Sequence, residues 1–210
     1  SDKSHSSVLR HASTLIKILN DLNIESSFSS DTVALSNFII SELSLYNTHL
    51  VDDGVDIEIV NQASYFISSA FDDIFTRKKL YSGAASNGFL LRTQNEPGAL
   101  SRFWEMTDEI SKGVNEQTVD LAILAMSLIE IGYLGKYENL PDRFTLIRVQ
   151  SEALELAIEE WFIIQKPSRE YRVSNQSYTA RPLWSILSII LLVSIGLYYV
   201  TEQLISKKYE

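Results

Sequence analysis

The sequence predicts an all-α protein, with a helical domain of about six or more helices followed by one C-terminal transmembrane helix. Three observations favour this fold class. Apolar residues recur at the spacing of about 3.6 residues that places them on one face of a helix. The strict alternation of apolar and polar residues that is typical of strands persists nowhere in the chain. Finally, an uncharged run near the C-terminus has the length that a bilayer requires.

Three helices are expected in the first part of the chain. The first carries a single apolar stripe over residues 8–22. The second begins at Ser30 or Asp31, because both side chains are good N-caps. The segment 50–56, LVDDGVD, then breaks the helical pattern, and a third helix is expected over residues 57–74.

Two polar segments that contain glycine follow, residues 82–88 and 93–100, and we expect both to be loops. Three further helices are expected over residues 99–110, over residues 115–131 and over residues 142–165. Asn115 can cap the second of these helices. Glu116 would then lie in its first turn, where the helix dipole favours a negative charge.

The segment IGYLGKY, which closes the fifth expected helix, contains two glycines followed by a lysine. It does not fit a phosphate-binding loop, because only two residues separate Gly132 from Gly135 and Tyr137 stands where Ser or Thr is needed. A glycine near a helix end is instead typical of a left-handed C-terminal cap. We therefore predict a structural turn, with Tyr133 and Tyr137 packed against a neighbouring helix and Lys136 toward solvent.

Composition excludes several classes of function. The chain has 210 residues, a net charge of −9 and no cysteine. Without cysteine there are no disulfides, thiolate metal sites or cysteine nucleophiles. Before Arg181 there are 15 basic residues against 25 acidic ones, and such an acidic domain repels phosphate backbones, so no nucleic acid is expected as a partner. The N-terminal segment SDKSHSSVLR has no apolar core, so we expect no signal peptide.

No catalytic residue, metal ligand or cofactor site is predicted. The three histidines, His5, His11 and His49, lack the spacing of a metal site and are expected at the solvated surface. Adjacent acids on a helix point about 100° apart and do not form a catalytic dyad, so the pairs at 52–53 and 159–160 are expected to be solvated. The pair Asp72–Asp73 differs because it interrupts an apolar helix end. One acid could cap the following segment or pair with Arg77, or the pair could form a recognition surface.

The C-terminal region predicts a membrane anchor. Between Arg181 and Glu202 lie 20 residues without formal charge, which span about 30 Å as a helix. Trp184 lies near one end, and Tyr198 and Tyr199 near the other, as membrane-interface aromatics do. A buried core helix is the alternative, but such helices usually keep a polar stripe. The expected organisation is a helical domain (1–165), a polar linker (166–181), a transmembrane helix (182–205) and a short periplasmic tail (206–210).

Charges on either side of the expected span give its orientation. Four basic residues lie between residues 166 and 181, and two follow the span. Because positive residues are enriched on the cytoplasmic side of a membrane, the helical domain is expected in the cytoplasm. Small residues within the span allow close contact between helices and could support self-association, although the span contains no GxxxG motif. These residues are Ser185, Ser188, Ser194 and Gly196.

The order of three motifs resembles one family. The acidic pair in AFDDIF comes first, then the aromatic pair Phe103 and Trp104 in SRFWEM, which we expect in the core, and then the helix closing as SLIEIGYLGKYE. With the C-terminal span, this order resembles the DotU/TssL (IcmH) family of bacterial type VI and type IVB secretion systems. Asp73 stands where the family usually has Glu, Glu138 stands where it has Arg, and the segment 81–98 departs from the family pattern.

The resemblance implies a structural, non-catalytic subunit of a secretion-system membrane complex, with type VI favoured over type IVB. It implies two small helical bundles that meet at a groove, insertion in the bacterial inner membrane, and partners in a TssM/IcmF-like inner-membrane protein and cytoplasmic baseplate proteins. Carried over by position, the interaction residues would be Asp72, Asp73, Lys136, Tyr137 and Glu138. The double substitution Asp72→Lys/Asp73→Lys is expected to impair secretion without unfolding the domain.

Two other classes of protein have a comparable layout. A tail-anchored helical regulator of the Bcl-2 type has similar length, but its NWGR-like segment is missing here. A membrane-tethered hydrolase needs a nucleophile and a base in a recognisable local arrangement, and the sequence contains none. Co-purification with a membrane partner would favour the secretion subunit, whereas turnover of a small substrate would favour the hydrolase.

Overall fold

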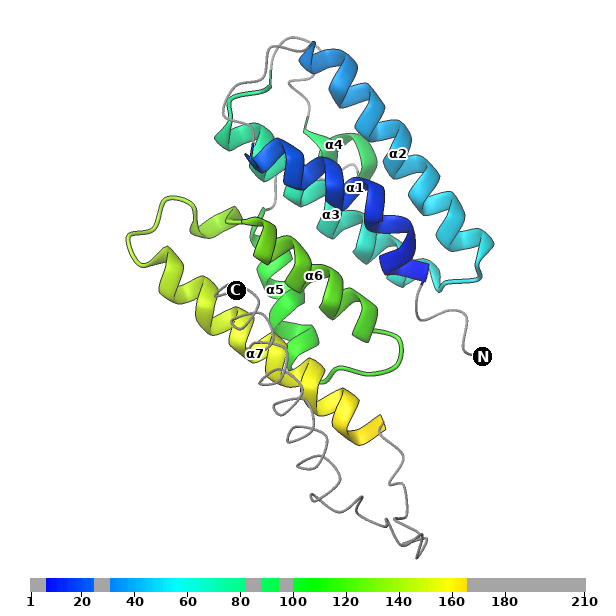
Figure 1. Ribbon diagram of the computed structural model, residues 1–210, viewed down its shortest axis with the longest axis vertical. Coiled ribbons are helices and arrows are strands. Elements are labelled where there is room, and N and C mark those ends of the chain that lie inside the picture. Colours follow the sequence, from blue (N-terminus) through cyan, green and yellow to red (C-terminus); the bar gives the residue numbers. More distant parts are fainter. Residues whose placement is uncertain (1–6, 25–30, 82–87, 95–99, 166–210) are drawn as a thin grey trace, which may run out of the picture. The chain divides into compact units, whose positions relative to one another are not determined.

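A computed structural model describes residues 7–24, 31–81, 88–94 and 100–165 (Figure 1). These described residues form α-helices and one short 3₁₀ helix, with no strand among them, which confirms the all-α class. No helix in these four stretches combines the length and apolar character needed to cross a bilayer. The expected linker, transmembrane helix and tail, with Trp184, Tyr198 and Tyr199, lie outside the described residues.

The first three helices pack against one another in pairs. They are α1 (Ser7–Ile24), α2 (Thr32–Asp52) and α3 (Ile57–Arg77), which Figure 1 shows in blue to cyan. Asp31 caps α2, since its carboxylate accepts two backbone amides of the first turn at 2.9 and 3.2 Å. The long, strongly periodic segments therefore fold as predicted.

A short helix that the sequence analysis did not predict, α4 (Phe89–Gln94), packs against α3. Its six residues form less than two turns, which is too short for a periodic apolar pattern to be recognised. Isolated helices of this length are not stable in water. Phe89 and Leu90 are nevertheless fully buried, so α4 is stabilised by tertiary packing.

The remaining helices are α5 (Leu100–Ser111), α6 (Val119–Ile131), η2 (Gly135–Tyr137) and α7 (Arg143–Gln165). The expected start of the fifth helix was wrong. Asn115 accepts the amides of Gln117 and Thr118 at 2.9 and 3.1 Å and so caps a turn that precedes α6. Because α6 begins only at Val119, the acidic residue in its first turn is Asp120.

Two groups of helices share one core. The helices α1, α2 and α3 with α4 form one group, and α5, α6 and α7 form the other, while α1 and α3 also contact α6. Both groups lie within one compact unit. The helix α3 is the most enclosed element, because every residue from Ala63 to Phe75 is buried. Phe103 and Trp104 of α5 are completely buried, as predicted for core aromatics.

Candidate functional site

The acidic pair of α3 lies inside the protein. Asp72 is 6% exposed and Asp73 is 1% exposed. Buried carboxylates are costly unless they are hydrogen-bonded or paired. Each of these two carboxylates meets that requirement, because each accepts hydrogen bonds from the backbone of a different segment of the chain.

Asp73 holds the turn that follows α6, residues 132–137, which we call the α6 turn. Its carboxylate accepts the backbone amides of Gly135 at 2.8 Å and Leu134 at 3.3 Å. It also pairs with Arg77, four residues later on α3, at 2.9 Å. Arg77 in turn donates to the carbonyl oxygen of Gly132 at 3.0 Å. The Asp73–Arg77 pair therefore clamps the α6 turn against the end of α3.

Two glycines give the α6 turn its path. Gly132 is the C-cap of α6 in the left-handed region, with φ of 106°, and Gly135 has φ of 52°. Residues with a Cβ avoid this region. A Cβ on Gly135 would also lie 2.6 Å from the Tyr133 hydroxyl. The turn therefore leaves no room for a side chain at Gly135.

Aromatic side chains of α5 cover the α6 turn. The Tyr133 ring lies 4.0 Å from the ring of Phe103, and the Tyr137 ring lies 4.8 Å from that of Trp104. The Trp104 indole also donates to the carbonyl oxygen of Leu134 at 3.2 Å. Such aromatic contacts contribute about 0.5–1.5 kcal/mol each beyond the area they bury. Both tyrosines thus fix the turn to α5.

The outward side of the α6 turn carries the groups that solvent can reach. Lys136 is exposed, with its ammonium 5.1 Å from the centre of the Tyr137 ring. Glu138 is partly exposed, and its carbonyl oxygen accepts a hydrogen bond from Arg143 at 2.8 Å. Tyr137 is 9% exposed and belongs to the core. The structure therefore separates the five expected interaction residues into exposed and buried ones.

Asp72 holds α4. Its carboxylate accepts the amides of Phe89 at 2.6 Å and Leu90 at 3.0 Å, together with the hydroxyl of Tyr81. Burial raises the pKa of the Asp72 carboxyl above its ordinary value, although these three hydrogen bonds oppose the shift. The fit is close, since a Cβ on Gly88 would lie 2.9 Å from an Asp72 carboxylate oxygen. Asp72 therefore caps the first turn of a helix that lies 17 residues further along the chain.

The burial of Asp72 and Asp73 changes the expected effect of reversing their charges. Two lysines at these positions would place ammonium groups against the Arg77 guanidinium and four backbone amide donors. A buried charge without a partner of opposite sign is strongly destabilising. The double substitution is therefore expected to destabilise the domain itself, in contrast to the sequence-based expectation.

A second polar cluster joins α1 to the end of α2. The Asp53 carboxylate lies 2.6 Å from Arg10 and 2.9 Å from His11, and the His11 ring lies 4.9 Å from that of His49. The hydrogen bond from His11 holds the pKa of the Asp53 carboxyl below its ordinary value, with smaller help from the Arg10 charge. His5 lies outside the described residues. Within the stretches that the structure describes, no three His, Cys, Asp or Glu residues are arranged to hold a metal.

The fold and its buried polar groups define a helical protein in which these carboxylates support the architecture. Comparison with known families identifies the chain further: the model of the DotU family, described as type VI secretion system protein DotU, matches residues 7–203. The chain therefore belongs to the DotU family and is a type VI secretion system component. Searches of the curated proteins and of the solved structures give no match.

Proposed function

We propose that this chain is a structural, non-catalytic subunit of the membrane complex of a type VI secretion system. In this proposal residues 182–205 anchor it in the bacterial inner membrane as a single span. The helical domain lies in the cytoplasm, binds a TssM/IcmF-like inner-membrane protein and docks baseplate proteins.

One observation carries the proposal. The family match runs from residue 7 to residue 203, so it includes both the helical domain and the uncharged run of residues 182–201. The aromatic residues Trp184, Tyr198 and Tyr199 near the ends of that run support a membrane segment. The two buried carboxylates support the structural role, because each is engaged by hydrogen bonds within the protein.

The α6 turn offers a contact for a partner protein. We assign the exposed Lys136 and the partly exposed Glu138 to direct contact, because solvent and partners reach them. Asp72, Asp73 and Tyr137 would act as positioning residues, since they are buried and hold α4 and the turn in place. A rigidly held turn presents its exposed groups at lower entropic cost on binding.

A secretion assay tests this assignment. In a strain that lacks the chain, wild type should restore release of a secreted effector, whereas Lys136→Glu should reduce release about tenfold, equivalent to about 1.4 kcal/mol of partner binding. The matched control is Lys17→Glu, a charge reversal at an exposed position of α1, which should secrete like wild type. Normal secretion by Lys136→Glu would refute the contact through the α6 turn. No secretion defect in the strain without the chain would refute the proposed function itself.

A further inference from the structure

The helix α7 exposes an unusual amount of apolar surface. Of its described residues only Leu154 is fully buried. Several large apolar side chains are between 38% and 71% exposed, and these are Phe144, Leu146, Val149, Leu156, Phe162, Ile163 and Ile164. Single exposed apolar residues are common, but a contiguous patch of them marks an interaction site.

Four of these exposed residues, with Ala153, follow a seam along one side of α7. Val149, Leu156 and Ile163 are spaced seven residues apart, and Leu146 and Ala153 form a second row with the same spacing. This arrangement is the a/d pattern by which one helix packs along another. We call these five residues the α7 seam. Leu156 lies about 200° around the helix from the buried Leu154, so the seam does not face the core of the domain.

Acidic side chains lie beside and within the α7 seam, since Glu160 continues the row of Leu146 and Ala153 at the same spacing. The four glutamates at 152, 155, 159 and 160 lie in the last part of α7, and no basic residue follows Arg148 within the helix. Arg148 lies 3.7 Å from Glu152, and both side chains are well exposed. Among the described residues, neither Glu155 nor Glu159 has an ion-pair partner. The seam therefore combines an apolar stripe with a net negative charge.

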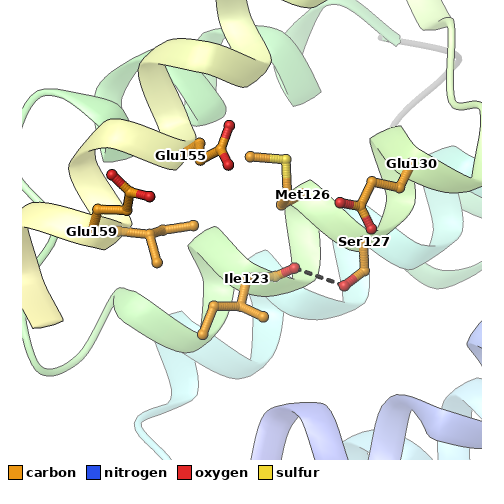
Figure 2. A pocket seen from close by; sticks show the side chains of 7 residues that line it. Ile123, Met126, Ser127, Glu130, Glu155 and Glu159 are labelled. Atoms are coloured by element: carbon orange, nitrogen blue, oxygen red, sulfur yellow. Dashed lines mark hydrogen bonds between the residues drawn. The ribbon is translucent and has the colours of Figure 1, made fainter.

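A pocket between α6 and α7 opens beside these glutamates (Figure 2). Ile123, Met126 and Ile158 provide its apolar lining, while the carboxylates of Glu130, Glu155 and Glu159 also line it. Its volume is about 330 Å³, far more than the ~10–15 Å³ of such space that one water molecule requires. A long side chain with an apolar stem and a cationic end matches both the lining and the charge of this pocket.

We propose that the α7 seam is the docking surface for a basic amphipathic helix of a partner protein. Leu, Ile or Val side chains of that helix would cover Val149, Leu156 and Ile163. A flanking Lys or Arg would enter the α6–α7 pocket, where Glu130, Glu155 and Glu159 neutralise it. The surface consists of residues of α6 and α7 alone, and its proposed role does not depend on the proposed function.

Charge favours this partner over two other occupants of an apolar helix face, a second copy of the chain and an anionic bilayer. A second copy of the chain paired through α7 by two-fold symmetry would bring the same glutamates to both sides of one interface. Like charges at facing positions destabilise paired helices. A bilayer surface rich in anionic lipids would likewise repel the glutamates. A helix with Lys or Arg beside its apolar stripe can cover the apolar residues of the α7 seam and neutralise the nearby glutamates at the same time.

The test uses two synthetic helical peptides of about three heptads, with Leu at the a and d positions. One peptide carries Lys at the flanking positions and its control carries Glu there. Binding to the full chain in phosphatidylcholine nanodiscs is measured by fluorescence anisotropy, with empty nanodiscs as the blank. Wild type should bind the Lys peptide at least tenfold more tightly than the Glu peptide.

Two variants separate the contributions of charge and apolar contact. Glu155→Lys/Glu159→Lys should make the chain bind the Glu peptide more tightly than the Lys peptide. Leu156→Gln should weaken binding of the Lys peptide at least tenfold. The control Asp52→Lys/Glu58→Lys changes the same charge at exposed positions of α2 and α3 and should bind like wild type. Circular dichroism should show the same helix content in all variants, because every altered side chain is exposed.

The proposal is overturned by any of three results. Equal binding of the two peptides would exclude charge selection, and wild-type binding by Leu156→Gln would exclude the seam. A full-length dimer that Leu156→Gln converts to monomer would assign the seam to a second copy instead. None of these results depends on secretion or on the membrane partner, so this proposal and the proposed function can fail separately.

Discussion

At the residue scale, the stability of the fold depends on two carboxylates of α3, the most buried helix. Asp73 has three hydrogen-bond donors around it, two from the α6 turn and one from Arg77. It links α3 to a segment about 60 residues away in sequence. Removal of such a group leaves every donor unsatisfied in a site that water does not reach freely.

The substitution Asp73→Ala is predicted to lower the free energy of unfolding by about 3–5 kcal/mol, because it leaves the Arg77 charge and two amides without a partner. Urea unfolding followed by circular dichroism measures this loss. The control Asp108→Ala breaks an exposed i,i+4 pair with Lys112 and should change stability by less than about 1 kcal/mol. If both substitutions lower the free energy of unfolding by the same amount, Asp73 does not hold the α6 turn.

Asp72 gives a prediction about pH. Its folded-state pKa is raised by burial, so its contribution to stability is fully present below the unfolded-state pKa of about 3.9 and is lost as the pH rises through the folded-state value. Asp72→Asn removes this titration. The free energy of unfolding of wild type minus that of Asp72→Asn should therefore fall as the pH rises above about 4. A difference that stays constant or rises with pH would contradict the assigned environment.

Local spacing predicted only part of this chemistry. It gave the two structural options for the acidic pair, a cap on a later segment and an ion pair with Arg77, and the structure contains both. It could not identify the α6 turn as the partner of Asp73, because no sequence pattern connects positions about 60 residues apart. Tyr81, nine residues after Asp72, was also missed as its donor, because it lies beyond the end of α3, where helix spacing no longer predicts which side chains meet.

At the scale of elements, the α6 turn is the segment most sensitive to a single methyl group. Gly135→Ala would combine a left-handed backbone with a Cβ 2.6 Å from the Tyr133 hydroxyl. That ring cannot move aside easily, because it packs on Phe103 and Trp104. Backbone strain costs about 1 kcal/mol, and overpacking adds about 1–3 kcal/mol.

The control for this prediction is Gly54→Ala. Gly54 has φ of 77°, but a Cβ added there would meet no atom of the described residues within 4 Å, so only the backbone cost applies. Thermal unfolding should therefore show a clearly larger loss of stability for Gly135→Ala than for Gly54→Ala. Equal losses would mean that the turn relaxes and that Tyr133 does not restrict it.

Helix length decided which elements could be predicted. The four longest helices, with 18 to 23 residues, each extend over several turns, so their apolar faces are visible in the sequence. The six-residue α4 is too short for such a pattern and forms because Asp72 and the core hold it. The start of α6 was misplaced because Asn115 caps the preceding turn with the same side-chain chemistry that caps a helix.

At the scale of the whole molecule, the proposed membrane anchor is the feature with the simplest test. In a host without type VI secretion genes, the full chain should remain in the membrane pellet, whereas a chain that ends at Arg181 should stay in the supernatant. A wash at about 1 M salt shortens the Debye length to about 3 Å and removes proteins held by charge alone. If the truncated chain still pelleted after this wash, a single anchor at residues 182–205 would be wrong.

The fold class was predictable because composition and periodicity decide it, and the family became recognisable from three motifs in order. The partner surfaces were not predictable from the sequence, because the exposure of a side chain depends on how the helices pack. Lys136 and Tyr137 are neighbours in the sequence, yet one is exposed and the other belongs to the core. The exposed apolar seam of α7 could not be predicted either, because its residues have the same pattern as those of a helix that faces the core.

The most direct test of the structural role is affinity purification of the tagged full chain from detergent-solubilised membranes of its own host. We predict that a TssM/IcmF-like inner-membrane protein elutes with the chain in a fixed ratio, and that the purified complex turns over no small substrate. An immunoblot of the starting membranes should verify that this partner is present. A chain that elutes alone from membranes containing the partner would contradict the account.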